Sequence, residues 1–147
     1  MMRRLLTTAL AALFTTAAFA QTPAPRTAKP TGALALAQGS WVMVTADGQD
    51  MSASGQDVVV TITDNSYTQA VNGTIMERGT FKLDETKKPM TIDITVVEGD
   101  DAGKIQLGVV EVTATTMRGK LCAPGQTVRP TDFEPAEGFF AFTARKK

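Results

Sequence analysis

The sequence contains no histidine and only one cysteine, Cys122, among its 147 residues. Without histidine the chain cannot build a Ser-His-Asp or Cys-His catalytic arrangement or the usual zinc sites. One cysteine cannot form an intramolecular disulfide. Because no histidine can activate its thiol, we interpret Cys122 as a small buried apolar residue or a free thiol. We therefore expect no catalytic residues, no metal and no cofactor, and predict that the chain is not an enzyme.

An excess of positive charge is also lacking. The chain has 15 basic and 15 acidic residues, and four of the basic ones precede Gln38, where no acidic residue occurs. From Gln38 onward the chain therefore carries 11 basic against 15 acidic side chains. Because binding to phosphates requires clustered Lys and Arg, we expect no nucleic-acid partner.

Long apolar runs are missing as well, and the one exception lies at the N-terminus. Arg3 and Arg4 precede an apolar stretch, residues 5–17, that four threonines interrupt, and an Ala-Phe-Ala sequence ends at Ala20. This pattern is typical of a Sec-type signal peptide over residues 1–20 with cleavage after Ala20. The run is shorter than the roughly 20 residues of a membrane span. We therefore predict a periplasmic or secreted protein with no membrane span after signal cleavage.

A segment rich in Pro, Ala and Thr follows, over residues 21–37. Its prolines prevent both regular helix and sheet pairing, so we interpret the segment as a linker. Near its end, residues 34–38 are expected to form one short helical turn. The folded domain is predicted to cover residues 38–147.

The rest of the chain has an abundant alternation of apolar and polar residues. In the stretch 79–95, Phe81 and Leu83, and later Ile92 and Ile94, alternate with polar residues on either side of a charged turn. A period of two is typical of strands with one buried face. The same pattern predicts eight strands, at residues 39–45, 58–63, 66–71, 74–83, 90–97, 105–112, 117–122 and 138–145.

Short turns connect most of these strands. The strongest hairpin signal is Asn72-Gly73, because both residues tolerate the positive φ of a tight turn. No helical pattern intervenes, so the strands should pair in chain order as an antiparallel meander. Eight strands can close on themselves and so remove the exposed edges. We predict an all-β, single-domain, eight-stranded antiparallel meander barrel; a two-sheet sandwich is the alternative, and the meander order favours the barrel.

The interior of such a barrel would be lined by the apolar faces of its strands. Glu77 and Glu111 fall in phase with apolar faces and are candidates for polar groups inside it. A bulge at Gly79 or the strand end at Val112 would instead turn them outward, and we favour this second interpretation. The candidate ligand-lining residues are Met43, Phe81, Ile92, Ile94, Glu111 and Phe140.

Several blocks of the chain resemble one family of small bacterial domains. These blocks are residues 38–41, 79–84, 87–93, Gly103-Lys104 with Gly108, and 129–133. They are similar to a lipocalin-like exported domain family of unknown function that is abundant in planctomycetes. The chain departs from it at Val109-Val110, where the family commonly carries an aromatic residue, and around Cys122, where the family often shows a Cys-aromatic-Ala-Pro run. The resemblance implies a lipocalin-like barrel and export, but no activity.

The start of the first strand resembles lipocalins more widely. In lipocalins the Trp of a Gly-x-Trp start lies at the closed end of the barrel and is covered by an Arg from near the last strand. Gly39, Trp41 and Arg145 are the matching residues here. An Arg stacked on Trp is a favourable cation–π contact. The resemblance therefore implies a structural role for all three.

The long connection before the last strand contains the Arg-Pro-Thr-x-Phe block, with Arg129, Pro130 and Phe133. This block could cap the barrel mouth or bind an anion. Long connections are commonly held down by packing of their own side chains. We therefore predict that the block is a latch that fixes the connection to the barrel.

Three classes of function follow from this pattern. The first is a non-catalytic barrel that binds a small apolar molecule, the second is a module that binds or inhibits an envelope protein, and the third is an enzyme. We expect a monomer of the first class. A packed interior would favour the second class. The first class requires a cavity lined by Met43, Val60, Phe81, Ile92, Ile94 and Phe140.

Overall fold

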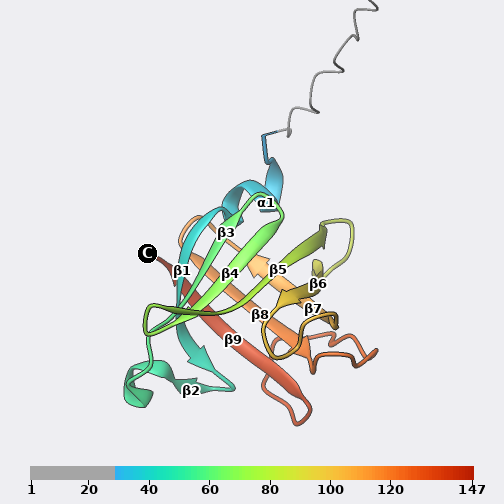
Figure 1. Cartoon of the computed structure of the whole chain (residues 1–147). Helices are drawn as coiled ribbons and strands as arrows, with labels where there is room; N and C mark the ends of the chain where they lie inside the picture. The colour runs from blue at the N-terminus through green and yellow to red at the C-terminus, as the bar shows by residue number, and fades with distance from the viewer. Residues whose placement is uncertain (1–28) are drawn as a thin grey trace, which may run out of the picture.

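The computed structural model describes residues 29–147 of the chain. The predicted signal peptide and the first part of the predicted linker lie outside these residues. Figure 1 shows one sheet that curls into a barrel. Its strands are β1 Gly39–Ala46, β2 Gln49–Asp50, β3 Val58–Thr63, β4 Ser66–Val71, β5 Thr74–Asp84, β6 Thr91–Glu98, β7 Ile105–Val112, β8 Thr116–Cys122 and β9 Phe139–Lys146.

Each barrel strand pairs antiparallel with the next one along the chain, and β1 also pairs with β9. This pairing closes a barrel of eight strands. The prediction of an all-β, lipocalin-like antiparallel meander is therefore confirmed, and the sandwich alternative is wrong. The short strand β2 is an addition that pairs only with β1, and the 3₁₀ helix η1 Met51–Ser54 follows it.

The turn between β4 and β5 follows from the chemistry of Asn72 and Gly73. Both residues have positive φ, 50° and 82°. These are the backbone conformations that a two-residue hairpin requires and that Asn and Gly adopt most readily. The turn sets the register of β4 against β5, in which Val71 lies opposite Thr74.

One end of the barrel is closed by the helix α1 Gly32–Ala37, which confirms the predicted helical turn. Ala37 is buried, and its carbonyl oxygen accepts a hydrogen bond of 2.8 Å from Trp41 Nε1. Gln38 joins the end of α1 to the β3–β4 turn, because its amide exchanges two hydrogen bonds with the backbone of Asp64, of 2.7 and 3.1 Å. The sequence predicts that the folded domain begins at Gln38. The structure shows that it begins earlier, with α1.

Trp41 lies at this closed end, as the resemblance implies, but the cation above it is Lys146. The ammonium Nζ of Lys146 lies 4.8 Å from the ring centroid of Trp41. The prediction that Arg145 covers the ring is wrong because side chains alternate along β9. In the register, Trp41 faces Lys146, whereas Arg145 points outward into a shallow hollow beside η1. Gly39, with a φ of 104°, starts the strand beside the Lys146 side chain.

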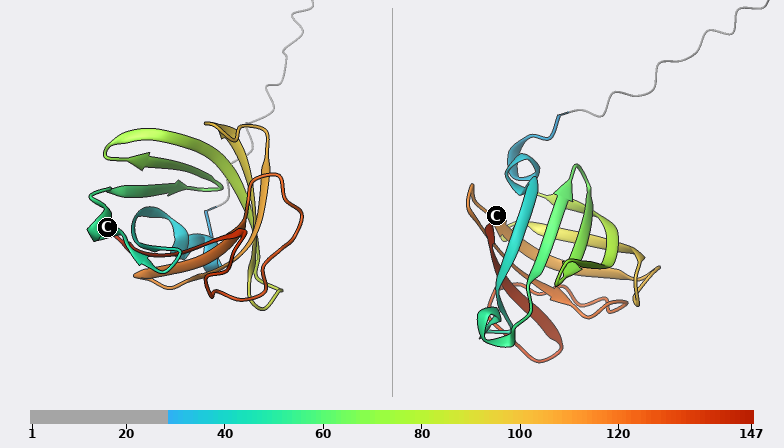
Figure 2. Two further views of the ribbon diagram at one scale, coloured as in Figure 1. Left: turned by 90° about the horizontal axis from the view of Figure 1, so that it is seen from below. Right: turned by 60° about the vertical axis from the view of Figure 1, so that its left-hand side comes forward.

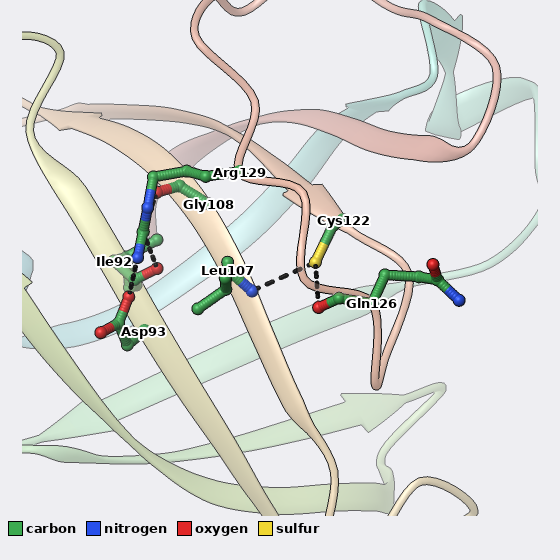
Figure 3. Close-up of polar contacts among 7 residues, drawn as sticks. All are labelled: Ile92, Asp93, Leu107, Gly108, Cys122, Gln126 and Arg129. Carbon is green, nitrogen blue, oxygen red and sulfur yellow. Dashed lines mark hydrogen bonds and ion pairs between the residues drawn. The ribbon is translucent and has the colours of Figure 1, made fainter.

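The connection between β8 and β9 forms an outer layer over one side of the barrel. Figure 2 shows the ring of strands from the end opposite α1, with this connection outside the ring. Arg129 fixes it in place, as Figure 3 shows. The guanidinium group donates hydrogen bonds of 3.1 Å to Ile92 O and 2.9 Å to Gly108 O, and it pairs with the carboxylate of Asp93. The predicted latch is confirmed, and Pro130 within it is buried.

Two further contacts hold the same connection to β8. Lys120 Nζ lies 2.8 Å from Asp132 Oδ1, and its side chain is only 6% exposed. The guanidinium carbon of Arg118 lies 4.2 Å from the ring centroid of Phe133. The latch therefore engages the backbone of β6 and β7 and the side chains of β8.

Cys122 is buried beneath the start of this connection as a free thiol. Its sulfur accepts a hydrogen bond of 3.3 Å from Leu107 N and donates one of 3.4 Å to Gln126 O (Figure 3). The predicted reading of this residue, as a buried thiol without a disulfide, is confirmed. Its contacts are structural, since they join β7, β8 and the connection.

Candidate ligand cavity

A cavity of about 120 Å³ lies inside the barrel. Five of the six predicted lining residues, and also Val60, surround it. Because the side chains of each strand alternate, these positions face inward from β1, β3, β5, β6 and β9. The confirmed lining residues are Met43, Phe81, Ile92, Ile94 and Phe140.

Glu111 is the exception: it is wrong as a candidate for the interior, whereas the outward orientation that the sequence favours for it is confirmed. Its side chain is 54% exposed and lies 3.0 Å from Arg118 on the outer surface. The inner face of β7 carries Gln106, Val110 and Val112 instead. The outer face reads as apolar because the β8–β9 connection covers it, which leaves Val109 only 2% exposed.

Glu77 shows the opposite error, since it faces inward where the sequence favoured an outward position. Its carboxylate lines the cavity. A bulge does interrupt β5, but its extra residue is Met76, because Gln69 pairs with Glu77 while Ala70 pairs with Ile75. Glu77 therefore stays in phase with the inner face of β5. A second bulge lies beside Gly79, and its extra residue is Val97 on β6.

Gly79 creates the space that lets a tyrosine reach Glu77. A Cβ at Gly79 would lie 2.6 Å from Cε1 and 2.7 Å from the hydroxyl of Tyr67. Because Gly79 has no Cβ, the ring of Tyr67 can cross this residue, and the Tyr67 hydroxyl donates a hydrogen bond of 2.7 Å to Glu77 Oε1. Burial raises the pKa of Tyr67, and the hydrogen bond and negative charge of Glu77 raise it further. Tyr67 therefore stays protonated and acts as a hydrogen-bond donor.

Two glutamines complete the polar part of the wall. Gln69 lies directly opposite Glu77 in the β4–β5 register, and Gln106 lies at the start of β7. The amide nitrogen of Gln106 donates a hydrogen bond of 3.2 Å to Cys122 O. The other cavity-lining side chains, apart from Tyr67, are apolar.

The polar groups gather toward the end of the barrel that lies away from α1. The C-terminal end of β5 approaches α1, where Glu85 accepts a hydrogen bond of 2.9 Å from Ala33 N. Glu77 lies in the first half of β5 and so lies at the other end. Near α1 the wall is apolar, with Trp41 and Ala37. The cavity thus has an apolar base near α1, and its polar groups lie on the part of the wall farther from α1.

The sequence did not single out Tyr67, Gln69 or Gln106. The signal for Tyr67 and Gln69 is present, because both are in phase with each other along β4 and opposite the inner positions of β5. In an alternating strand the polar residues are expected on the outer face, so the pattern does not indicate that Gln69 faces the cavity. Within residues 29–147, no group of three potential ligand side chains is arranged to hold a metal ion, and no helix is long and apolar enough to cross a membrane.

Comparisons with models of protein families, with curated proteins and with solved structures found no match to this chain. The resemblance to the lipocalin-like exported family stays a prediction. The barrel and its cavity rest on the structure alone.

Proposed function

We propose that this chain is an exported, non-catalytic barrel that binds one small, compact and largely apolar molecule. The observation that carries the proposal is the interior cavity of about 120 Å³ with its mostly apolar wall. An interior filled by side chains would instead have favoured a protein-binding module. The proposal of export rests on the signal-peptide pattern of residues 1–20.

The cavity volume limits the size of the ligand. Pockets for drug-sized ligands occupy about 300–1,000 Å³, and an apolar cavity of about 150 Å³ holds one benzene molecule. A volume of about 120 Å³ is therefore suited to a body of roughly five or six carbon atoms. It is too small to enclose a long acyl chain, so the ligand differs in size from a fatty acid or a retinoid.

Binding of benzene tests this proposal, because its six carbon atoms match the size and polarity that the cavity suits. We expect saturable binding in a ligand-observed NMR titration of the purified protein. Val60→Phe should abolish it by filling the cavity from β3. The matched control is Val59→Phe, one residue away on the outer side of the same strand, which should retain binding. Absence of saturable binding to the wild type, or equal binding to the Val60→Phe variant, would refute the proposal.

A protein-binding module is the second candidate, and exposed apolar side chains favour it. Four of them lie on the neighbouring strands β5, β6 and β7, namely Ile75, Met76, Val97 and Ile105. Native mass spectrometry of the protein isolated from its own compartment separates the two candidates. A bound small molecule supports the binding barrel, whereas a stable complex with an envelope protein supports the module.

A further inference from the structure

The cavity wall carries a single negative charge, which indicates the chemical class of the ligand. This inference rests on the proposed function. Glu77 is the only acidic side chain on the wall, and no Lys or Arg lies on it within residues 29–147. A carboxylate in apolar surroundings attracts a positive group strongly, because low polarity weakens screening. The wall therefore favours a cation and repels an anion.

The cation next to Glu77 along the chain does not compensate this charge. Arg78 follows Glu77 on β5 and faces the outside, where its Nε lies 3.3 Å from Glu98 Oε2. The Tyr67 hydroxyl that bonds to Glu77 Oε1 is neutral. Oε2 of Glu77 makes no hydrogen bond to another group in the described part of the chain, so it is available to a ligand.

The remaining polar groups of the wall also offer hydrogen-bond acceptors to a ligand. The amide nitrogen of Gln106 is engaged by Cys122 O, which leaves the carbonyl oxygen Oε1 as an acceptor. Gln69 brings a second amide next to Glu77. The only O–H group of Tyr67 already donates its hydrogen bond to Glu77. The Glu77 carboxylate and the two amide oxygens therefore offer acceptors to a donor group of the ligand.

We infer that the ligand is a small organic ammonium ion, whose hydrocarbon body fills the apolar base and whose N–H groups donate to Glu77. A carboxylic acid of the same size is excluded by like charge, since its carboxylate would face that of Glu77. A neutral alcohol can donate one hydrogen bond but gains nothing from the charge. The ligand class is thus set by one side chain.

The test compares two ligands that share a hydrocarbon body and differ in charge, cyclopentylammonium and cyclopentanol. Their affinities for the purified protein are measured by NMR titration near neutral pH. Both ligands can donate a hydrogen bond to Glu77, but only the ammonium ion also gains from its negative charge. We therefore expect cyclopentylammonium to bind about tenfold or more tightly than cyclopentanol.

Two variants assign this preference to Glu77. Glu77→Gln keeps the shape and an acceptor for Tyr67 but removes the charge, so it should abolish the preference while cyclopentanol affinity stays unchanged. The matched control is Glu111→Gln, the same substitution on the outer surface, which should keep the wild-type preference. If Glu77→Gln fails to fold, cyclopentanecarboxylate tested against the wild type serves instead, because like charge with Glu77 should prevent it from binding.

The outcomes separate the inference from the proposed function. Equal affinity of the wild type for both ligands overturns the inference, while saturable benzene binding still supports the binding barrel. Equal loss of both ligands in Glu77→Gln also overturns the inference, because the effect is then one of shape. Absence of binding by benzene and by both cyclopentyl compounds overturns the two proposals together.

Discussion

Replacing Arg129 with Ala should destabilise the fold more than its ion pair with Asp93 would suggest. The guanidinium donates to two backbone carbonyls, Ile92 O and Gly108 O, and pairs with Asp93. Hydrogen bonds from charged donors contribute about 1.5–3 kcal/mol each and are not additive. Because the Arg129 side chain is 31% exposed and water can replace part of these contacts, we expect a total loss of about 2–3 kcal/mol.

The ion pair itself accounts for little of this effect. The Asp93 side chain is 47% exposed, and pairs near the surface contribute about 0.2–1 kcal/mol. Asp93→Ala should therefore lower the free energy of unfolding by less than about 1 kcal/mol. The stabilisation from Arg129 should persist in high salt, which screens the ion pair but not the contacts to the carbonyl groups.

Urea unfolding followed by tryptophan fluorescence measures both variants, because Trp41 is the only tryptophan in the chain. The matched control is Arg145→Ala, an exposed arginine on β9, which should change stability by less than about 0.5 kcal/mol. The reasoning is refuted if Asp93→Ala costs as much as Arg129→Ala, or if high salt removes most of the difference between Arg129→Ala and the wild type.

Three further predictions concern single groups. Tyr67 is the only tyrosine, so a near-ultraviolet absorbance titration should show it ionising above the ordinary pKa of about 10, and Glu77→Gln should lower that pKa. Gly79→Ala should destabilise the fold by roughly 1–3 kcal/mol, measured by urea unfolding, because the new Cβ overlaps the backbone oxygen of Thr95 and the Tyr67 ring. The hydrogen bond from Lys120 holds the pKa of Asp132 below its ordinary value. The resulting stability is present above the unfolded pKa of about 3.9 and is lost as pH falls through the folded pKa. Urea unfolding of Lys120→Met should show a smaller acid-dependent component, because only the backbone hydrogen bond from Glu134 remains.

The alternation of residues is sufficient to predict the barrel wherever one face of a strand meets solvent. On β6, Ile92 and Ile94 line the cavity, while Asp93 between them lies outside with Arg129. The pattern of such a strand reports directly which face is buried. The same reasoning gave five of the six predicted cavity residues.

The pattern fails on β7 because both of its faces are covered. Val110 faces the cavity, and Val109 is buried under the outer layer, so the two cannot be told apart by hydrophobicity. The apolar phase of Val109 made Glu111 a candidate for the interior, and only the strand end at Val112 favoured its outward orientation. The latch itself was predicted, but the strands that it covers depend on long-range contacts that a local pattern does not contain.

The position of a bulge explains the error at Glu77, and the alternation of side chains along β9 explains the error at Arg145. Moving the extra residue of β5 from Gly79 to Met76 reverses the orientation of Glu77, and sequence alone does not locate a bulge to a single residue. Arg145 was predicted to cover Trp41 from the resemblance to lipocalins, without regard to the alternation of side chains along β9. Phe140 and Phe142 face the cavity, so the alternation along β9 already places the inner positions at even numbers and favours Lys146.

The pairing of β1 with β9 joins Trp41 to Lys146, from opposite ends of the folded chain. Contacts between residues so distant in sequence form slowly, because the intervening chain must lose its freedom before the pairing can stabilise it. Until the last strand has been synthesised, β1 and β8 are open edges that can pair with other chains. The eight residues of β9 therefore cover the last open edges of the sheet. A chain truncated before Phe139–Lys146 should be prone to aggregation.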